Sequence, residues 1–205
     1  MPKQAADTVI VLDFETTGLS PDNGDRAIEI GAVLIQNGEV VDSFQRLMNP
    51  GRRVNSFIEN YTGISNAMLK DADGCAQVMA EFCDFIGDYN LVAHNASFDR
   101  RFLDAELAII DRQYGGDFAC SMLIARRLYQ QAPNHKLGGL VEYKNLPTEG
   151  VFHRALADAE MTARLWLQML EDIAMEYDKT DLTFRQVQKL AKIPKAGVAS
   201  FLQKL

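Results

Sequence analysis

The opening part of the chain contains three strand-like segments in succession, and this run constrains the fold more than any other part of the sequence. The segments are Val9–Glu15, Arg26–Ile35 and Val40–Leu47. Asn37-Gly38 separates the second from the third, and Asn-Gly between apolar runs is a strong hairpin signal because both turn residues tolerate positive φ. The sequence therefore predicts an antiparallel meander at the start of the fold.

Beyond the meander, helical patterns alternate with one further short strand. The strand is predicted at Leu91–Ala93, where a brief apolar run ends in polar residues. Strands first, and then strands alternating with helices, favour an α/β fold with a mixed sheet. Helices are predicted where apolar residues recur at helical spacing, at Cys75–Ile86, Phe98–Ile109, Ser121–Gln131, Leu137–Tyr143 and Ala155–Glu171.

The composition is that of an ordinary globular protein. The chain has 205 residues, of which 47% are hydrophobic and 24% charged, and no apolar run approaches the roughly 20 residues that cross a membrane. The segment before Thr8 is polar, so no secretory signal is expected. Three cysteines without a Cys-x-x-Cys motif argue against structural disulfides and a zinc site. We therefore expect a cytoplasmic protein without membrane contacts.

Charge is distributed unevenly along the chain. Residues 178–205 carry six basic and two acidic side chains, whereas residues 1–177 carry 15 basic and 26 acidic ones, a net charge of −11. We therefore expect a main domain at 1–177 followed by a basic helical tail at 178–205. An acidic body repels the phosphates of nucleic acid unless bound cations intervene.

Four acidic residues stand where a cation site would need them. Asp13 and Glu15 are two apart at the end of the first strand, so both side chains project from one face. Asp99 follows the strand at 91–93, and Asp158 lies at the start of the last long helix. Carboxylates are the ligands that Mg²⁺ prefers. Two such ions would balance the four charges and allow an anionic substrate to bind.

One histidine completes this set. His153 precedes Asp158 by five residues, in the loop or first turn ahead of the helix. A histidine there suits a general base, because its pKa lies near neutral pH. His94 and His135 fit structural roles better, since His94 ends an apolar strand and His135 lies in a turn.

Taken together, three motifs resemble those of the DEDDh 3′–5′ exonucleases. They are Asp-Phe-Glu-Thr-Thr-Gly at 13–18, His-Asn-Ala-Ser-Phe-Asp at 94–99, and His-x4-Asp ending at Asp158. The nearest relatives that these motifs suggest are the proofreading exonuclease subunits and domains of bacterial DNA polymerase III. The resemblance implies a ribonuclease H-like fold, a mixed five-stranded sheet flanked by helices. It also implies residue roles: metal ligands Asp13, Glu15, Asp99 and Asp158, a general base His153, and a 3′-nucleotide site at Thr17, Gly18, Leu19, Ile64, Asn95 and Phe98. For Leu19, Ile64 and Phe98, packing in the core of the protein is the alternative role.

The function implied is hydrolysis of the 3′-terminal phosphodiester of DNA, single-stranded or frayed, with two Mg²⁺ or Mn²⁺ ions and release of nucleoside 5′-monophosphates. DNA is preferred to RNA as the substrate, and a DNA polymerase is the partner that the family context suggests. Trimming of RNA ends stays open as an alternative, because discrimination depends on contacts to the 2′-hydroxyl that the sequence does not reveal. A catalytically idle interaction module for a polymerase is the alternative of another class, and it would be expected to lack an acidic ligand.

The basic tail predicts two short amphipathic helices. Apolar residues recur at helical spacing after Thr183, a good N-cap, and Ile193-Pro194 interrupts the pattern. A second apolar stripe runs from Val198 to Leu205. Such helices bury little by themselves, so they either dock on the main domain or bind a nucleic-acid strand or a protein partner.

Overall fold

The computed structural model describes residues 5–147 and 154–205. His153, the candidate general base, lies outside the described residues. In the part of the chain that is described, none of the helices combines the length and the apolar character that a membrane crossing requires.

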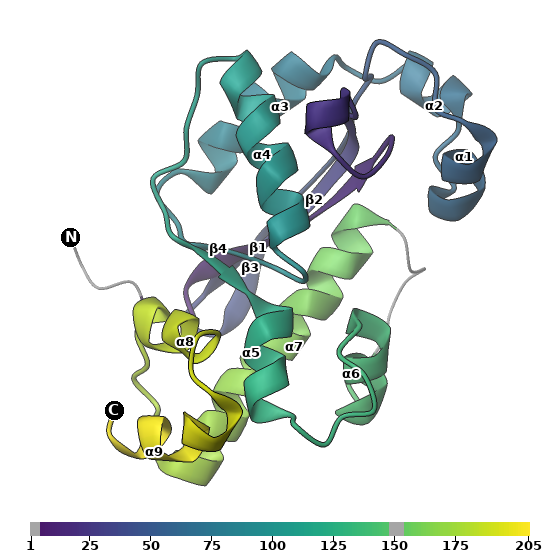
Figure 1. Cartoon of the computed structure of the whole chain (residues 1–205). Helices are drawn as coiled ribbons and strands as arrows, with labels where there is room; N and C mark the ends of the chain where they lie inside the picture. Colours follow the sequence, from purple (N-terminus) through teal and green to yellow (C-terminus); the bar gives the residue numbers. More distant parts are fainter. Residues whose placement is uncertain (1–4, 148–153) are drawn as a thin grey trace.

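A mixed sheet of five strands lies at the centre of the described structure, as the sequence predicted (Figure 1). The strands are β1 (Val9–Thr16), β2 (Ala27–Gln36), β3 (Glu39–Leu47), β4 (Leu91–Ala93) and β5 (Phe118–Cys120). Their spatial order is β3-β2-β1-β4-β5. The pairs β1–β2 and β2–β3 are antiparallel, whereas β1–β4 and β4–β5 are parallel. The antiparallel half is the predicted meander.

The turn between β2 and β3 has the geometry that its sequence favours. Asn37 and Gly38 have φ values of 52° and 81°, as a type I′ turn requires at both central positions. This turn aligns the two strands from Gln36 opposite Glu39 to the far end of β3. The hairpin prediction is therefore confirmed.

Helices cover both faces of the sheet (Figure 1). The helices α3 and α4 pack on one face, and α5, α7 and α8 pack on the other. Short helices α1 and α2 lie beyond the meander, and α6 and α9 contact α7. The bounds are α1 (Ser56–Thr62), α2 (Asn66–Lys70), α3 (Cys75–Ile86), α4 (Ser97–Ile109), α5 (Ser121–Leu128), α6 (Leu137–Tyr143), α7 (Ala155–Tyr177), α8 (Phe184–Leu190) and α9 (Val198–Gln203).

The alternation of side chains along β1 determines which layer each residue meets. Ile10 and Leu12 are buried in the core beneath α3 and α4. Val9 and Val11 are buried in the opposite core with Trp166 of α7. Because side chains alternate between the two faces of a strand, the next odd-numbered residues of β1 also face the α7 side.

Three elements and two helix ends differ from the sequence predictions. The helices α1 and α2 and the strand β5 were not predicted from the apolar pattern. Their signals are local instead: Asn55 and Ser65 cap α1 and α2 through side-chain hydrogen bonds. The helix α5 ends earlier than predicted, at Leu128, and α7 continues beyond Glu171 to Tyr177.

The basic tail folds against the main domain. Phe184 of α8 is buried beside Trp166 of α7, with ring centroids 6.0 Å apart. The predicted cap Thr183 is confirmed, and it forms a full capping box with Gln186. The amide of Ala6 donates to the carbonyl of Leu182, so the tail lies beside the segment that leads into the start of β1. The other buried tail residues in this core are Leu182, Val187, Leu190, Val198 and Leu202.

Candidate active site

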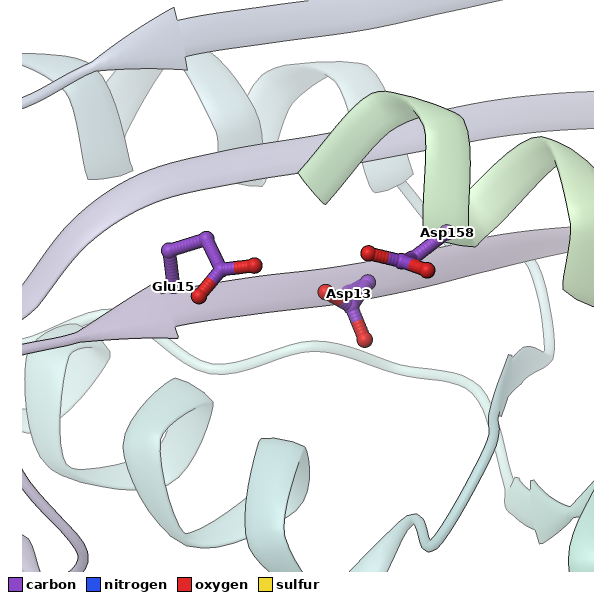
Figure 2. Close-up of side chains that lie close together, drawn as sticks. All are labelled: Asp13, Glu15 and Asp158. Carbon is purple, nitrogen blue, oxygen red and sulfur yellow. The ribbon is translucent and has the colours of Figure 1, made fainter. Parts of the chain in front are cut away.

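Three of the predicted acids meet near the end of β1. Asp13 and Glu15 extend the row of Val9 and Val11, so they face α7, and Asp158 reaches them from the first turn of that helix (Figure 2). One ligand oxygen from each of the three carboxylates lies within 4.8 Å of the other two. An arrangement of three carboxylates at this spacing fits a hard divalent cation.

The fourth acid, Asp99, lies outside this trio but in contact with β1. It is 2% exposed in the first turn of α4, and its Oδ1 accepts a hydrogen bond from the Phe14 amide at 3.2 Å. The chain reaches α4 through Asn95, whose φ of 67° turns the backbone sharply after β4. Asparagine tolerates this left-handed conformation better than most residues. The turn therefore directs Asp99 back onto the strand that carries Asp13 and Glu15.

A close approach of α7 to β2 places Asp158. A Cβ atom on Gly31 would lie 2.1 Å from the amide nitrogen of Leu156 and 2.2 Å from the carbonyl carbon of Ala155. These are backbone atoms, so no side chain at position 31 is compatible with this packing. The first turn of α7 therefore rests directly on β2, one strand away from the pair of acids on β1.

An open cleft of about 730 Å³ contains the acids. Its walls include every predicted site residue of the described chain except Ile64. Leu19, in the loop after β1, is 78% exposed, so core packing does not account for it. Phe98 packs on Phe102 at a centroid distance of 5.0 Å and lines the cleft from α4. The remaining predicted residues in the walls are Thr17, Gly18 and Asn95.

Ile64 is placed differently from the expectation. It is 0% exposed and packs with Ile28, Val54 and Leu69 in a small core beneath α1 and α2. The structure therefore places Ile64 in the core and not in the wall of the cleft. Its burial instead supports the segment that carries α1.

Two aromatic residues in the cleft were missed by sequence reasoning. Phe57 and Tyr61 of α1 stack with ring centroids 5.9 Å apart, and they are 69% and 52% exposed. Both line the cleft. The spacing of four residues brings them onto one face of a helix, but no helix was predicted over this segment.

His94 is held in a structural role, as the sequence indicated. Its Nε2 donates to the carbonyl of His135 at 3.0 Å, and its Nδ1 lies 2.9 Å from the Ser121 hydroxyl. Burial lowers the pKa of His94 to about 4, so the ring is neutral near pH 7. Both ring nitrogens are engaged, and the side chain ties the end of β4 to the start of α5.

Burial raises the pKa values of Asp13, Glu15 and Asp99, and neighbouring acids raise those of Asp13 and Glu15 further. Burial is the largest cause for Asp13, whose pKa lies well above its usual range, and the charges of Asp99 and Asp158 add to it. Burial and the charge of Asp158 raise the pKa of Glu15 to about 8, while Arg154 lowers it. Burial raises the pKa of Asp99 to about 7, against the hydrogen bond from Phe14. The cluster therefore favours protons or cations over the bare charges.

A pH dependence of stability follows for the protein without divalent ions. Asp99 and Glu15 have pKa values of about 7 and about 8 in the folded chain, above the values near 4 of an unfolded chain. The folded state therefore binds these protons more tightly, and their stabilising contribution is lost as the pH rises through 7 and 8. We expect the unfolding temperature in a chelator to fall between about pH 5.5 and about pH 8.5. An unchanged or rising unfolding temperature across this range would contradict the assigned electrostatics.

Comparison with known sequences gives a family match over most of the chain. The profile of the exonuclease family (RNase_T) matches residues 10–166. The DNA polymerase III PolC-type proteins of Caldanaerobacter subterraneus subsp. tengcongensis and Bacillus subtilis are both 39% identical to this chain, over 164 and 170 residues. These matches cover 80% and 82% of this chain but 12% of each relative. The chain thus spans about an eighth of the length of these curated relatives.

Comparison with solved structures gives the same fold. Exonuclease X, solved in complex with 5′ overhanging duplex DNA, has a TM-score of 0.71 and 26% identity. The match covers 89% of this chain and 99% of that one. The nuclease domain of 3′hExo, a DEDDh family member bound to rAMP, has a TM-score of 0.70 at 23% identity, covering 81% of this chain and 92% of its own.

Proposed function

The chain belongs to the exonuclease family, and on that premise we propose that it hydrolyses the 3′-terminal phosphodiester of DNA and releases nucleoside 5′-monophosphates. Family membership supports a 3′–5′ exonuclease activity. The observation that carries the proposal is the convergence of Asp13, Glu15 and Asp158 on one point in an open cleft. The alternative of an idle interaction module is disfavoured, because all four acids are present.

We propose that the carboxylates hold a pair of hard divalent cations, Mg²⁺ or Mn²⁺. Asp13, Glu15 and Asp158 offer oxygens within 4.8 Å of one another. The fourth acid, Asp99, lies close enough to Asp13 for its charge to raise the pKa of Asp13. Divalent ions bound there would neutralise the acids and stabilise the charge that develops on the phosphate. The raised pKa values of the acids support this role, since buried like charges need a counter-ion.

The cleft walls are suited to a terminal nucleotide. Leu19, Phe57 and Tyr61 present exposed apolar surface on which a base can stack. Stacking of this kind tolerates any base, because every base has a π-face. Thr17 and Gly18 line the same wall, and we propose that the backbone there contacts sugar and phosphate, which are bound without reading sequence. We therefore propose digestion that is independent of sequence.

His153 is proposed as the general base that takes a proton from the attacking water. Its neighbour Arg154 precedes α7, whose first turn carries Asp158. As the water oxygen bonds to phosphorus, the bond from phosphorus to the 3′ oxygen of the penultimate nucleotide breaks. The leaving oxygen then gains a proton, and the terminal nucleotide departs with its 5′-phosphate.

Replacing His153 with alanine tests this assignment. We expect kcat to fall by about 10²–10⁴-fold, the usual contribution of a general base. Binding of Mn²⁺ to the metal-free protein, measured by calorimetry, should be nearly unchanged because His153 is not assigned as a ligand. Loss of Mn²⁺ binding in His153→Ala would instead make it a ligand.

Labelled strands test the reaction itself. A 3′-labelled single strand should release labelled mononucleotide at once, whereas a 5′-labelled strand should shorten step by step from its other end. Internal cuts, or degradation from the 5′ end, would contradict the proposal.

DNA is the proposed substrate, because one structural relative holds duplex DNA and the curated relatives are DNA polymerases. A time course on matched single-stranded DNA, a mismatched primer–template and RNA tests this preference. Faster removal of RNA ends would reverse it in favour of RNA trimming.

A DNA polymerase is the proposed partner, and proofreading the proposed cellular role. The PolC-type relatives contain a matching segment that makes up 12% of their length. We place the protein in the cytoplasm, in keeping with its three free cysteines. Co-purification with a polymerase under physiological salt, dependent on neither DNA nor RNA, would support the partner assignment.

A further inference from the structure

Glu29 of β2 is a buried acid with a dense set of hydrogen-bond partners. It is 0% exposed and stands opposite Glu15 in the β1–β2 register. Its Oε1 accepts from Nη2 of Arg154 at 2.7 Å and from Nε2 of Gln45 at 2.9 Å. Its Oε2 accepts from Nε of Arg154 and from the amide of Ala155, both at 3.1 Å. The two parallel hydrogen bonds from the Arg154 guanidinium form a fork, which is among the strongest and most directional contacts between side chains.

These contacts connect the beginning of α7 to β2, a strand that is far from it in the sequence. Arg154 is the N-cap residue of α7, yet its own side chain does not cap the helix. The carboxylate of Glu29 accepts the first helical amide, that of Ala155, in its place. Negative charge at a helix N-terminus is stabilised by the helix dipole. Glu29 therefore anchors the first turn of α7 through both a side chain and a backbone group.

Asp158 lies on that same turn. Its amide donates to the carbonyl of Arg154 at 3.0 Å, so the anchored residue and the acid are linked by one helical hydrogen bond. On the other side, Gly31 leaves no space between β2 and the backbone at Ala155 and Leu156. Gly31 thus sets how closely the first turn of α7 approaches β2, and the hydrogen bonds of Glu29 hold that turn in its orientation.

From this arrangement we infer that Glu29 is a positioning residue that, through Arg154 and Ala155, sets where the Asp158 carboxylate stands relative to Asp13 and Glu15. This inference rests on the proposed cation site. Partners that orient metal ligands typically change metal affinity or activity by about 10–100-fold when they are removed. Arg154 also offsets the charge of its neighbours, since it lowers the pKa of Glu15.

A second ion pair of the same chemistry supplies a matched control. Glu106 of α4 is 3% exposed and accepts from Arg26 at 2.8 and 2.7 Å and from the Ala27 amide at 3.1 Å. It too joins a helix to β2 by a fork and a backbone amide. However, Glu106 lies seven residues, about two helical turns, after Asp99. Its replacement should destabilise the protein without moving a ligand-bearing first turn.

The test compares Glu29→Gln with Glu106→Gln in the full chain. We measure Mn²⁺ affinity of the metal-free proteins by calorimetry, unfolding temperature, and kcat and KM on a short single strand of DNA. Glu29→Gln should weaken Mn²⁺ binding and lower kcat by about 10–100-fold each with little change in KM. Both substitutions should lower the unfolding temperature by similar amounts. Glu106→Gln, however, should keep Mn²⁺ affinity and kcat near those of the wild type.

Arg154→Lys carries the test if Glu29→Gln does not fold. Lysine keeps the charge beside Glu29 but lacks the planar fork, so Mn²⁺ affinity and kcat should fall in the same direction by a smaller factor. A folded Glu29→Gln or Arg154→Lys protein with wild-type Mn²⁺ affinity and kcat overturns the inference. So does an equal loss of Mn²⁺ affinity in Glu106→Gln. If the wild-type protein itself binds no Mn²⁺, the proposed cation site fails, and this inference fails with it.

Discussion

Replacing Asp158 with asparagine is expected to lower kcat by at least about 10³-fold, because cation-assisted stabilisation of a phosphoryl transfer supplies several kcal/mol and each 1.4 kcal/mol is worth about tenfold in rate. The asparagine keeps the size of the side chain but removes a negative charge whose oxygen lies within 4.8 Å of ligand oxygens of Asp13 and Glu15. Asp13→Asn should behave in the same way. Single-turnover rates on a 5′-labelled single strand measure the effect directly.

The same substitution should have an opposite effect on the stability of the metal-free protein. Asp158 raises the pKa of Asp13 and of Glu15, which means that its charge repels theirs in the folded state. Removing that charge relieves the repulsion, so the unfolding temperature in a chelator should rise while added Mn²⁺ stabilises less than it does in the wild type.

Glu171→Gln is the matched control, since Glu171 is an exposed acid farther along the same helix. It removes one charge from α7 and should keep the wild-type rate and the wild-type response to Mn²⁺. Activity of Asp158→Asn within tenfold of the wild type would remove Asp158 from the catalytic set.

The fold class and the identity of the candidate acidic ligands were predictable, because both follow from patterns between residues that are close in the sequence. The strand alternation that placed Ile10 and Leu12 in one core also determined which way Asp13 faces. The motif spacing then identified Asp99 and Asp158 as candidates without any tertiary structure. A pattern of this kind fails where a contact joins residues far apart in the sequence. Glu29 and Arg154, 125 positions apart, illustrate the limit, because nothing local marks either as the partner of the other.

A second limit of the sequence predictions concerns short elements, of which some were predicted and others were not. No helix was predicted at Ser56–Thr62 (α1), so the stacked pair Phe57 and Tyr61 was not recognised as part of the cleft. Ile64, which follows closely, was chosen instead on resemblance, and the structure buries it in a core. In the tail, by contrast, Thr183 and the apolar spacing predicted the helix α8 correctly. What they could not predict is the surface on which that helix docks.

Removing residues 178–205 is expected to unfold most of the protein at room temperature. Six buried side chains of this segment belong to the core that contains Trp166, and burying a large apolar side chain contributes about 1.5–3 kcal/mol. Together they approach the whole net stability of a typical domain, about 5–15 kcal/mol. Circular dichroism and thermal melts of the truncated chain would measure the effect, and Phe184→Ala alone should cost about 3–5 kcal/mol.

A charge variant separates this structural role from a role in strand binding. Lys189, Lys192 and Lys195 are exposed, so replacing all three with glutamine should leave the unfolding temperature nearly unchanged. The tail lies beside the segment that leads into the start of β1, whereas Asp13 and Glu15 lie near the strand's other end. A nucleic-acid strand whose 3′ end is in the cleft would have to extend along the sheet to reach these lysines.

The salt dependence of binding to long single strands measures whether the lysines touch phosphates. If they do, each lysine–phosphate ion pair that the triple variant removes should make the slope of log affinity against log salt shallower by about 0.7. An unchanged slope, together with a collapse in stability on truncation, would assign the tail to the core of the domain. A folded, stable truncation would instead make residues 178–205 a separate appendage.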